Sequence, residues 1–245
     1  MPSKAFVRLR DRSSAYDTDL ELADVLVRAF MRSQNTDQTI AEAAGVESVK
    51  YLKLSSRKNN KQSRKVIGRH LVNSIGVAYI KEIYEDFTEY LQVSVRRATL
   101  SGLNVDRFIG SDNFDFSSKE ILKAKNWDSV VELVSDKLFR SLESEKSTIS
   151  LIKKIIKKLG LDVDAGVVTA ALPYLDARHV LVHRDGLADE FYKKAHPNVH
   201  LIDGFIVTNF AFVNSARVAI MTLAERLDET LIEKGFVRES DMAGA

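Results

Sequence analysis

The chain has 245 residues, 45% of them hydrophobic and 29% charged, with a formal net charge of +2, so it can bury one good core or two small ones. It contains no cysteine, which excludes a disulfide framework, a thiolate nucleophile and a cysteine-based zinc site, and leaves its 5 histidines as the obvious proton carriers. No apolar run approaches the roughly 18 residues of a membrane-spanning helix, and residues 1–4 are followed by charge rather than an apolar signal core, so we expect a cytoplasmic protein.

Apolar residues recur at helical spacing through most of the chain, and the 3 Pro and 11 Gly interrupt it rarely, so we expect an all-α fold. The first predicted helix is amphipathic and covers 17–31, and a short one follows over 39–44. We expect a helical extension with a basic linker over 1–60, a helical bundle over 61–237 and a disordered tail over 238–245.

Residues 48–81 contain no Asp or Glu and carry nine basic residues. A polyanion such as RNA would meet this stretch first, and the candidate RNA-binding residues in it are Lys58, Lys61, Arg64 and Lys65. A solvated linker is an equally good interpretation of the same charge. A faint helix-turn-helix pattern over 37–65 leaves DNA binding as a third possibility.

Most of the predicted elements follow this stretch. A long helix is expected over 66–99, with Gly68 and Gly76 making its first turns the least certain, and an irregular segment over 101–116. Ser117 and Glu120 form a predicted capping box at the start of a helix. The remaining expectations are helices over 127–143, 147–159 and 209–234, a helix over 173–184 that Pro173 opens, and a small hairpin or extended loop over 199–207.

The helix over 173–184 carries the strongest candidate site, Arg178-His179-Val180-Leu181-Val182-His183, which Arg184 follows and Gly186 closes. The three apolar residues indicate a partly buried helix, on which such a cationic cluster is costly without an anionic ligand or partner. His179 and His183 share one helical face, whereas Arg178 lies about 140° round the axis from His183 and roughly 7.5 Å below it along the axis. One helix therefore does not close a compact site, although two copies facing each other can.

This motif resembles the signature of the HEPN superfamily (higher eukaryotes and prokaryotes nucleotide-binding domain): an Arg, a polar residue, three mostly apolar residues and a His. The helix layout over about 66–236 is similar to that family as well. The resemblance implies a HEPN-like helical bundle that dimerises through the motif helices and acts as a metal-independent endoribonuclease in toxin, phage-defence or RNA-processing systems. It further implies that a cognate antitoxin or regulator can restrain it. The alternative is a non-catalytic member that binds RNA, a nucleotide or a partner.

Under this resemblance the candidate catalytic residues are Arg178, His179 and His183, with neither metal nor cofactor. His183 would take the 2′-hydroxyl proton or protonate the 5′-oxygen, and Arg178 would hold the phosphate oxygens. His179 would position the phosphate or share the proton transfer, and Arg184 would add an RNA contact. The expected products are a 2′,3′-cyclic phosphate and a 5′-hydroxyl.

Two other histidines, His196 and His200, flank a predicted turn at Pro197 and Asn198. No Asp or Glu cluster accompanies them at ligand spacing, so we expect a loop role rather than a metal site. The chain also has neither a glycine-rich phosphate loop nor a Gly-x-Ser-x-Gly sequence, which argues against an NTPase, a nicotinamide enzyme and an esterase.

Overall fold

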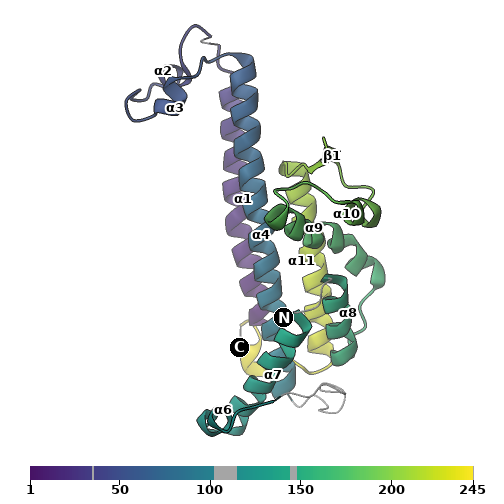
Figure 1. The fold of residues 1–245 in the computed structure, drawn as a ribbon. Helices are drawn as coiled ribbons and strands as arrows, with labels where there is room; N and C mark the ends of the chain where they lie inside the picture. Colours follow the sequence, from purple (N-terminus) through teal and green to yellow (C-terminus); the bar gives the residue numbers. More distant parts are fainter. Residues whose placement is uncertain (35, 102–114, 144–147, 245) are drawn as a thin grey trace. The chain divides into compact units, whose positions relative to one another are not determined.

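The computed structural model describes residues 1–34, 36–101, 115–143 and 148–244. Helices dominate these residues, which confirms the all-α class (Figure 1). Most of the irregular segment expected over 101–116 lies outside the described residues. Within them, no helix is long and apolar enough to cross a membrane.

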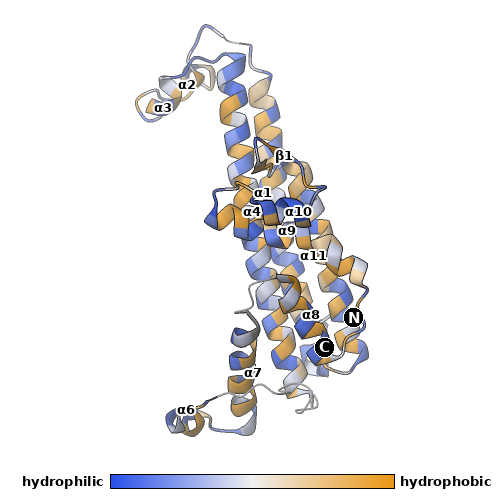
Figure 2. Ribbon diagram, turned by 45° about the vertical axis from the view of Figure 1, so that its right-hand side comes forward, coloured by the Kyte–Doolittle hydropathy of each residue, from blue (hydrophilic) through white to orange (hydrophobic). Residues whose placement is uncertain are grey.

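The described elements follow one another along the chain as helices, with a single hairpin before the last long helix. In order they are α1 (Lys4–Met31), α2 (Ile40–Ala43), α3 (Leu52–Ser55), α4 (Lys61–Leu100), α6 (Ser118–Lys123), α7 (Trp127–Glu143), α8 (Thr148–Leu159), α9 (Ala165–His183), α10 (Glu190–Ala195), β1 (Leu201–Ile202), β2 (Phe205–Ile206), α11 (Phe210–Glu233) and the 3-10 helix η1 (Glu239–Asp241). Along the longer helices hydrophilic and hydrophobic residues alternate, as helical spacing in the sequence predicts (Figure 2).

Local sequence signals set several boundaries of these elements. The capping box before α6 is confirmed, because the Ser117 hydroxyl accepts from the Glu120 amide and the Glu120 side chain accepts from the Ser117 backbone. The small hairpin is confirmed too, and its turn residues Asp203 and Gly204 have φ of 51° and 83°, the left-handed values that a tight hairpin turn requires.

The start of α9 is a correction to the sequence prediction. Pro173 does not open this helix but lies inside it, and Asp164 caps the N-terminus by accepting from the amides of Gly166 and Val167. A proline within a helix removes one backbone hydrogen bond and costs roughly 3 kcal/mol, which the packing of α9 has to offset. Seven buried side chains along α9 supply that packing: Val168, Ala171, Leu172, Leu175, Ala177, Val180 and Leu181.

The chain forms two compact units, each assembled from segments far apart in the sequence. Unit 1 comprises Met1–Ser13, Ile80–Ile206 and Ser215–Ala245, and unit 2 comprises Ser14–Tyr79 and Val207–Asn214. These boundaries differ from the division expected at residue 60. Helices α1 and α4 are each divided between the two units, and the sequence pattern along a continuous helix gives no sign of such a division.

In unit 2, glycines in α4 allow neighbouring segments to approach closely. A Cβ on Gly76 would lie 2.1 Å from the carbonyl oxygen of Thr208, and a Cβ on Gly68 would lie 2.9 Å from Cγ1 of Val27. Gly68 and Gly76 weaken the sequence prediction of a helix here, and this close packing is the reason that both positions are glycine. Thr208 is fully buried and its hydroxyl donates to the carbonyl oxygen of Asn73 at 3.0 Å.

The basic segment of unit 2 is folded rather than an open linker. The amide of Asn59 donates to Gln38, and the amide of Ile40 donates to Arg57, so residues 57–59 pair back onto 38–40. Helices α2 and α3 are each four residues long, about one turn, which does not support a helix-turn-helix with a recognition helix.

In unit 1, α8 packs against both α7 and α9, and α10 packs against α9. Its core is made of large side chains that are almost completely buried: Ile80, Ile83, Phe87, Leu138, Phe139, Ile152, Leu159, Leu175, Ile220, Leu223 and Leu227.

Both termini of the described chain are fixed in unit 1. The Ser3 amide donates to Asp228 on α11 at 2.8 Å, and the Ser3 hydroxyl donates to the same carboxylate. The Ala243 amide donates to the carbonyl oxygen of Pro2, and η1 precedes it. Residues 238–244 are thus ordered by contacts with the N-terminus, in place of the disordered tail expected from composition.

Candidate functional site

A cavity of about 530 Å³ lies in unit 1 beside the face of α9 that carries the motif. It is lined by residues of α4, α8, α9 and α10, and the polar groups at its wall include Tyr84, Asp176, Arg178, His179, Asp189 and His196. Apolar side chains such as Leu172 and Leu175 complete it. A cavity of this size with a few convergent polar groups is typical of small-molecule and nucleotide sites.

Arg178 is held at the cavity wall by weak contacts. Its Nη2 atom lies 3.9 Å from Oε1 of Glu85, and its Cζ atom lies 5.1 Å from the centroid of the Tyr84 ring. The Nε atom is buried and makes no hydrogen bond. The chain thus provides little compensation for this guanidinium, which lines the cavity and is suited to an anionic ligand.

The two motif histidines lie together on one face of α9, as the helical spacing predicts. Their ring centroids are 4.8 Å apart. His179 lines the cavity, whereas His183 is the exposed last residue of the helix and is not among the residues that line it. Within one chain the cavity therefore joins Arg178 with His179, and His183 stands beside His179.

The helix ends after His183 as the sequence predicts. Asp185 and Gly186 have φ of 49° and 88°, and the Gly186 amide donates to the carbonyl oxygen of Val180 at 3.1 Å. Arg184 is half exposed, and its Nη2 atom pairs with Oδ2 of Asp189 at 3.1 Å. The positive charge expected of Arg184 is thus partly neutralised within the chain.

The sequence prediction missed a second polar group in the cavity, the pair of His196 and Asp176. Nε2 of His196 lies 2.9 Å from Oδ2 of Asp176, and the His196 side chain is only 8% exposed. The ring of Tyr192 packs edge-on against His196, with centroids 4.9 Å apart. His196 does follow α10 in the loop, as expected, but the sequence did not indicate its buried contact, which exists because α10 packs against α9 and brings residues 20 positions apart together.

Tyr192 fixes this pair in place. Its hydroxyl donates to the carbonyl oxygen of Pro173 at 2.7 Å, and its amide donates to the Asp189 side chain that caps α10. Burial, together with the nearby Asp176 and Tyr174, raises the pKa of Tyr192 well above its ordinary value, so the phenol stays neutral. The sequence did contain a local signal for α10. Asp189 is a residue type that caps helix N-termini, and Tyr192 and His196 follow it four residues apart, the spacing of one helical face.

The RNA-binding candidates of the basic segment all belong to unit 2, where they differ in exposure. Lys58, Lys61 and Lys65 are exposed. Arg64 is only 6% exposed, and its Nη1 atom donates to the carbonyl oxygen of Asn59 at 2.5 Å. Arg64 is therefore occupied inside unit 2, and its expected contact with RNA is not supported by this placement.

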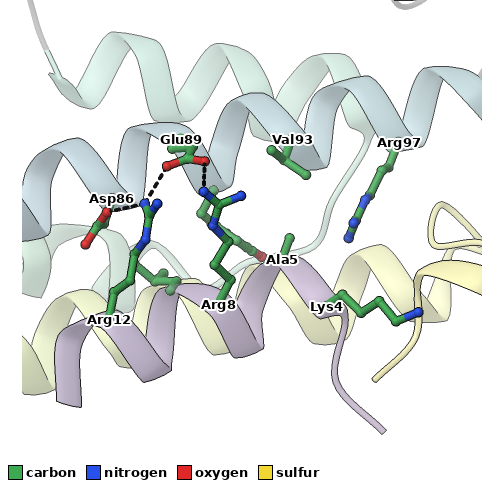
Figure 3. A pocket seen from close by; sticks show the side chains of 10 residues that line it. Lys4, Ala5, Arg8, Arg12, Asp86, Glu89, Val93 and Arg97 are labelled. Carbon is green, nitrogen blue, oxygen red and sulfur yellow. Dashed lines mark hydrogen bonds and ion pairs between the residues drawn. The ribbon is translucent and has the colours of Figure 1, made fainter. Parts of the chain in front are cut away.

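A smaller cavity of about 170 Å³ in unit 1 has charged walls of a different kind. Figure 3 shows Arg12 reaching both Asp86 and Glu89, with Arg8 on the other oxygen of Glu89. Burial raises the pKa of Asp86 while the Arg12 pair opposes the rise. Because the arginines of α1 and the carboxylates of α4 neutralise each other, this cluster serves to hold the two helices together.

Among the described residues, no group of three or more His, Asp or Glu side chains is placed to hold a metal ion. No protein-family model matches the sequence, and comparison with curated proteins and with solved structures gives no match either. The resemblance to the HEPN superfamily therefore depends on the motif and the order of the helices, and the activity it implies is a proposal.

Proposed function

We propose that this protein is a metal-independent endoribonuclease of the HEPN type. The observation that supports it most is that Arg178 and His179 line one cavity and that the His183 ring lies 4.8 Å from the His179 ring. A cationic group, two titratable rings and room for a nucleotide are the components that cleavage by the internal 2′-hydroxyl requires.

The chemistry follows from the residue types. The 2′-oxygen attacks phosphorus while the bond from phosphorus to the 5′-oxygen breaks, which gives a 2′,3′-cyclic phosphate and a 5′-hydroxyl. Arg178 stabilises the negative charge on the non-bridging oxygens with the guanidinium that lines the cavity. His183 transfers a proton at the 2′-oxygen or the 5′-oxygen. His179 positions the phosphate or shares that proton transfer.

Two copies of the chain would complete the site. His183 is exposed at the end of α9, so a second motif helix can approach it. A twofold arrangement would place the Arg178 cavity of one copy near the His183 of the other. We further propose that the setting is toxin or phage defence in the cytoplasm, where a cognate antitoxin or regulator would bind this face.

The direct test is incubation of purified protein with a labelled transcript in excess EDTA. We expect cleavage, cyclic phosphate ends that acid converts to a monophosphate, and no cleavage of DNA of the same sequence. His183→Ala should lose the activity while its circular dichroism and molar mass in solution remain those of the wild type. Intact RNA with the wild-type protein over a broad pH range would refute the proposal.

A second candidate is a non-catalytic protein that binds RNA, a nucleotide or a partner at the same face. The observation in its favour is the aromatic wall of the cavity, where Tyr84 and the 78% exposed Phe191 could stack on a base while Arg178 holds a phosphate. Equilibrium binding of a fluorescent RNA, lost in Arg178→Gln and accompanied by no cleavage, would favour this function over the first.

A further inference from the structure

Cleavage of RNA by its own 2′-hydroxyl needs two proton transfers. One group accepts the proton of the 2′-hydroxyl as the new oxygen–phosphorus bond forms, and a second donates a proton to the 5′-oxygen as the old bond breaks. The motif alone offers His183 and its neighbour His179 for both tasks, and these two rings stand side by side on one helical face.

His196 brings a further imidazole to the wall of the same cavity from a different element. It follows α10, whereas Arg178 and His179 lie on α9, so two different segments contribute these groups to the cavity wall. Its side chain is 8% exposed and is one of those that line the cavity. The buried His196 imidazole and the Arg178 guanidinium, whose Nε makes no hydrogen bond, therefore line the same cavity.

The Asp176 carboxylate determines which nitrogen of His196 can exchange a proton. At 2.9 Å the carboxylate accepts a hydrogen bond from Nε2, so Nε2 carries the hydrogen in the neutral ring and Nδ1 is the free nitrogen. The Tyr192 ring and the bond from Tyr192 to Pro173 restrict rotation of this imidazole. Carboxylate, imidazole and packing ring together form a pre-oriented proton-transfer group.

We propose that His196, oriented by Asp176, is a second proton-transfer residue of this cavity and complements His183 in the cleavage of RNA. This inference rests on the proposed function and adds a residue outside the motif. Asp176 is the positioning residue, because it acts on the substrate only through His196.

The test is the pH dependence of kcat/KM for RNA cleavage in the wild type and in the variants, because a loss of fold stability alone would not remove one limb of the profile. Other charged and titratable groups also face the cavity. Those groups are Tyr84 of α4, Asp176, Arg178 and His179 of α9, and Asp189 and Tyr192 at α10. We expect a bell-shaped profile for the wild type and the loss of one limb in His196→Gln, whereas His183→Ala should show no cleavage at any pH.

The size of the effect separates proton transfer from binding. His196→Gln should lower kcat by about 10²- to 10⁴-fold with KM nearly unchanged, because glutamine can still bond to Asp176 but cannot exchange a proton. Asp176→Asn should lower kcat by a smaller factor, because the imidazole remains but its tautomer and orientation are no longer fixed. His196→Asn serves as a second variant if His196→Gln does not fold, as judged by circular dichroism and melting temperature.

Matched controls are available nearby. His200→Gln and Asp162→Asn change an exposed histidine and an exposed aspartate outside the cavity, so both should cleave at the wild-type rate. The inference is overturned if His196→Gln keeps the wild-type kcat and both limbs, or raises KM alone, while His183→Ala is inactive. In that case the proposed function stands. Complete inactivity of the wild type would instead overturn both.

Discussion

Replacing Arg178 with glutamine should remove activity while leaving the fold almost intact. If Arg178 stabilises the charged phosphate, its loss should lower kcat by about 10²- to 10³-fold, the usual effect of deleting one such donor. The effect on stability is expected to be small because the arginine makes only weak contacts within the chain. This separation of activity from stability distinguishes a functional arginine from a structural one.

The stability estimate follows from those contacts. The pair with Glu85 spans 3.9 Å between side chains that are 30% and 61% exposed, and such pairs contribute about 0.2–1 kcal/mol. The contact with the Tyr84 ring, at 5.1 Å, adds about 0.5–1 kcal/mol. The buried Nε has no partner to lose. Unfolding free energy should therefore fall by at most about 2 kcal/mol, which lowers the melting temperature by several degrees.

The assay pairs single-turnover cleavage with urea denaturation of the same preparations. Glu85→Gln is the matched control, since it removes the same ion pair from its other side and should retain activity. The reasoning is wrong if Arg178→Gln unfolds with a loss of 4 kcal/mol or more and activity falls only in proportion to the unfolded fraction. It is equally wrong if the folded variant cleaves at the wild-type rate.

Three further predictions concern packing, pH and RNA affinity. Gly76→Ala should destabilise unit 2 by about 3 kcal/mol or more in urea, because the new Cβ would stand 2.1 Å from the Thr208 carbonyl oxygen. Burial raises the pKa of Asp228 above its ordinary 3.8, although hydrogen bonds from Ser3 oppose the rise. The unfolding free energy should therefore decline as pH rises from about 3.8 through the raised pKa, and this decline should be less steep in Asp228→Asn. Three exposed lysines of unit 2, Lys58, Lys61 and Lys65, can be replaced by glutamine in one variant. The slope of log K for RNA binding against log salt concentration should then become shallower by about 0.7 per lysine.

Each of these has its own control or refuting outcome. Gly68→Ala in the same helix should cost less, because its Cβ would lie 2.9 Å from a side-chain methyl of Val27, whereas Cβ at Gly76 would lie 2.1 Å from a backbone carbonyl oxygen. Equal pH slopes of stability for wild type and Asp228→Asn would contradict the second prediction. Lys234→Gln, an exposed lysine of unit 1, should leave the salt slope as it is, and an unaltered slope in the triple variant would exclude these lysines from the RNA contact.

The Asp228 prediction has a definite sign. Between the unfolded and the folded pKa the native carboxyl keeps a proton that the unfolded chain has released, so the unfolded state is favoured as pH rises through that window. Above the folded pKa the loss is complete. Asparagine cannot ionise and keeps an oxygen for the Ser3 amide, so it removes this part of the decline.

Local patterns in the sequence predicted many of the helices and their boundaries. Helical periodicity predicted α7, α8 and α11 closely, and the capping box at Ser117 predicted the start of α6. The relation of His179 to His183 also follows from residues four apart on one helix. These features depend on neighbours within one or two turns, so the sequence contains all the information they need.

Tertiary contacts decided the remaining features. Pro173 lies inside α9 because buried neighbours offset its missing hydrogen bond, and Arg64 points inward because Asn59 accepts from it. The cavity joins Tyr84 with residues about a hundred positions later, and the pairing of His196 with Asp176 exists because α10 packs back on α9. The sequence alone thus determined which side chains can do chemistry. Only the packing of distant helices decided which of them face one another, because burial and long-range contact have no local pattern.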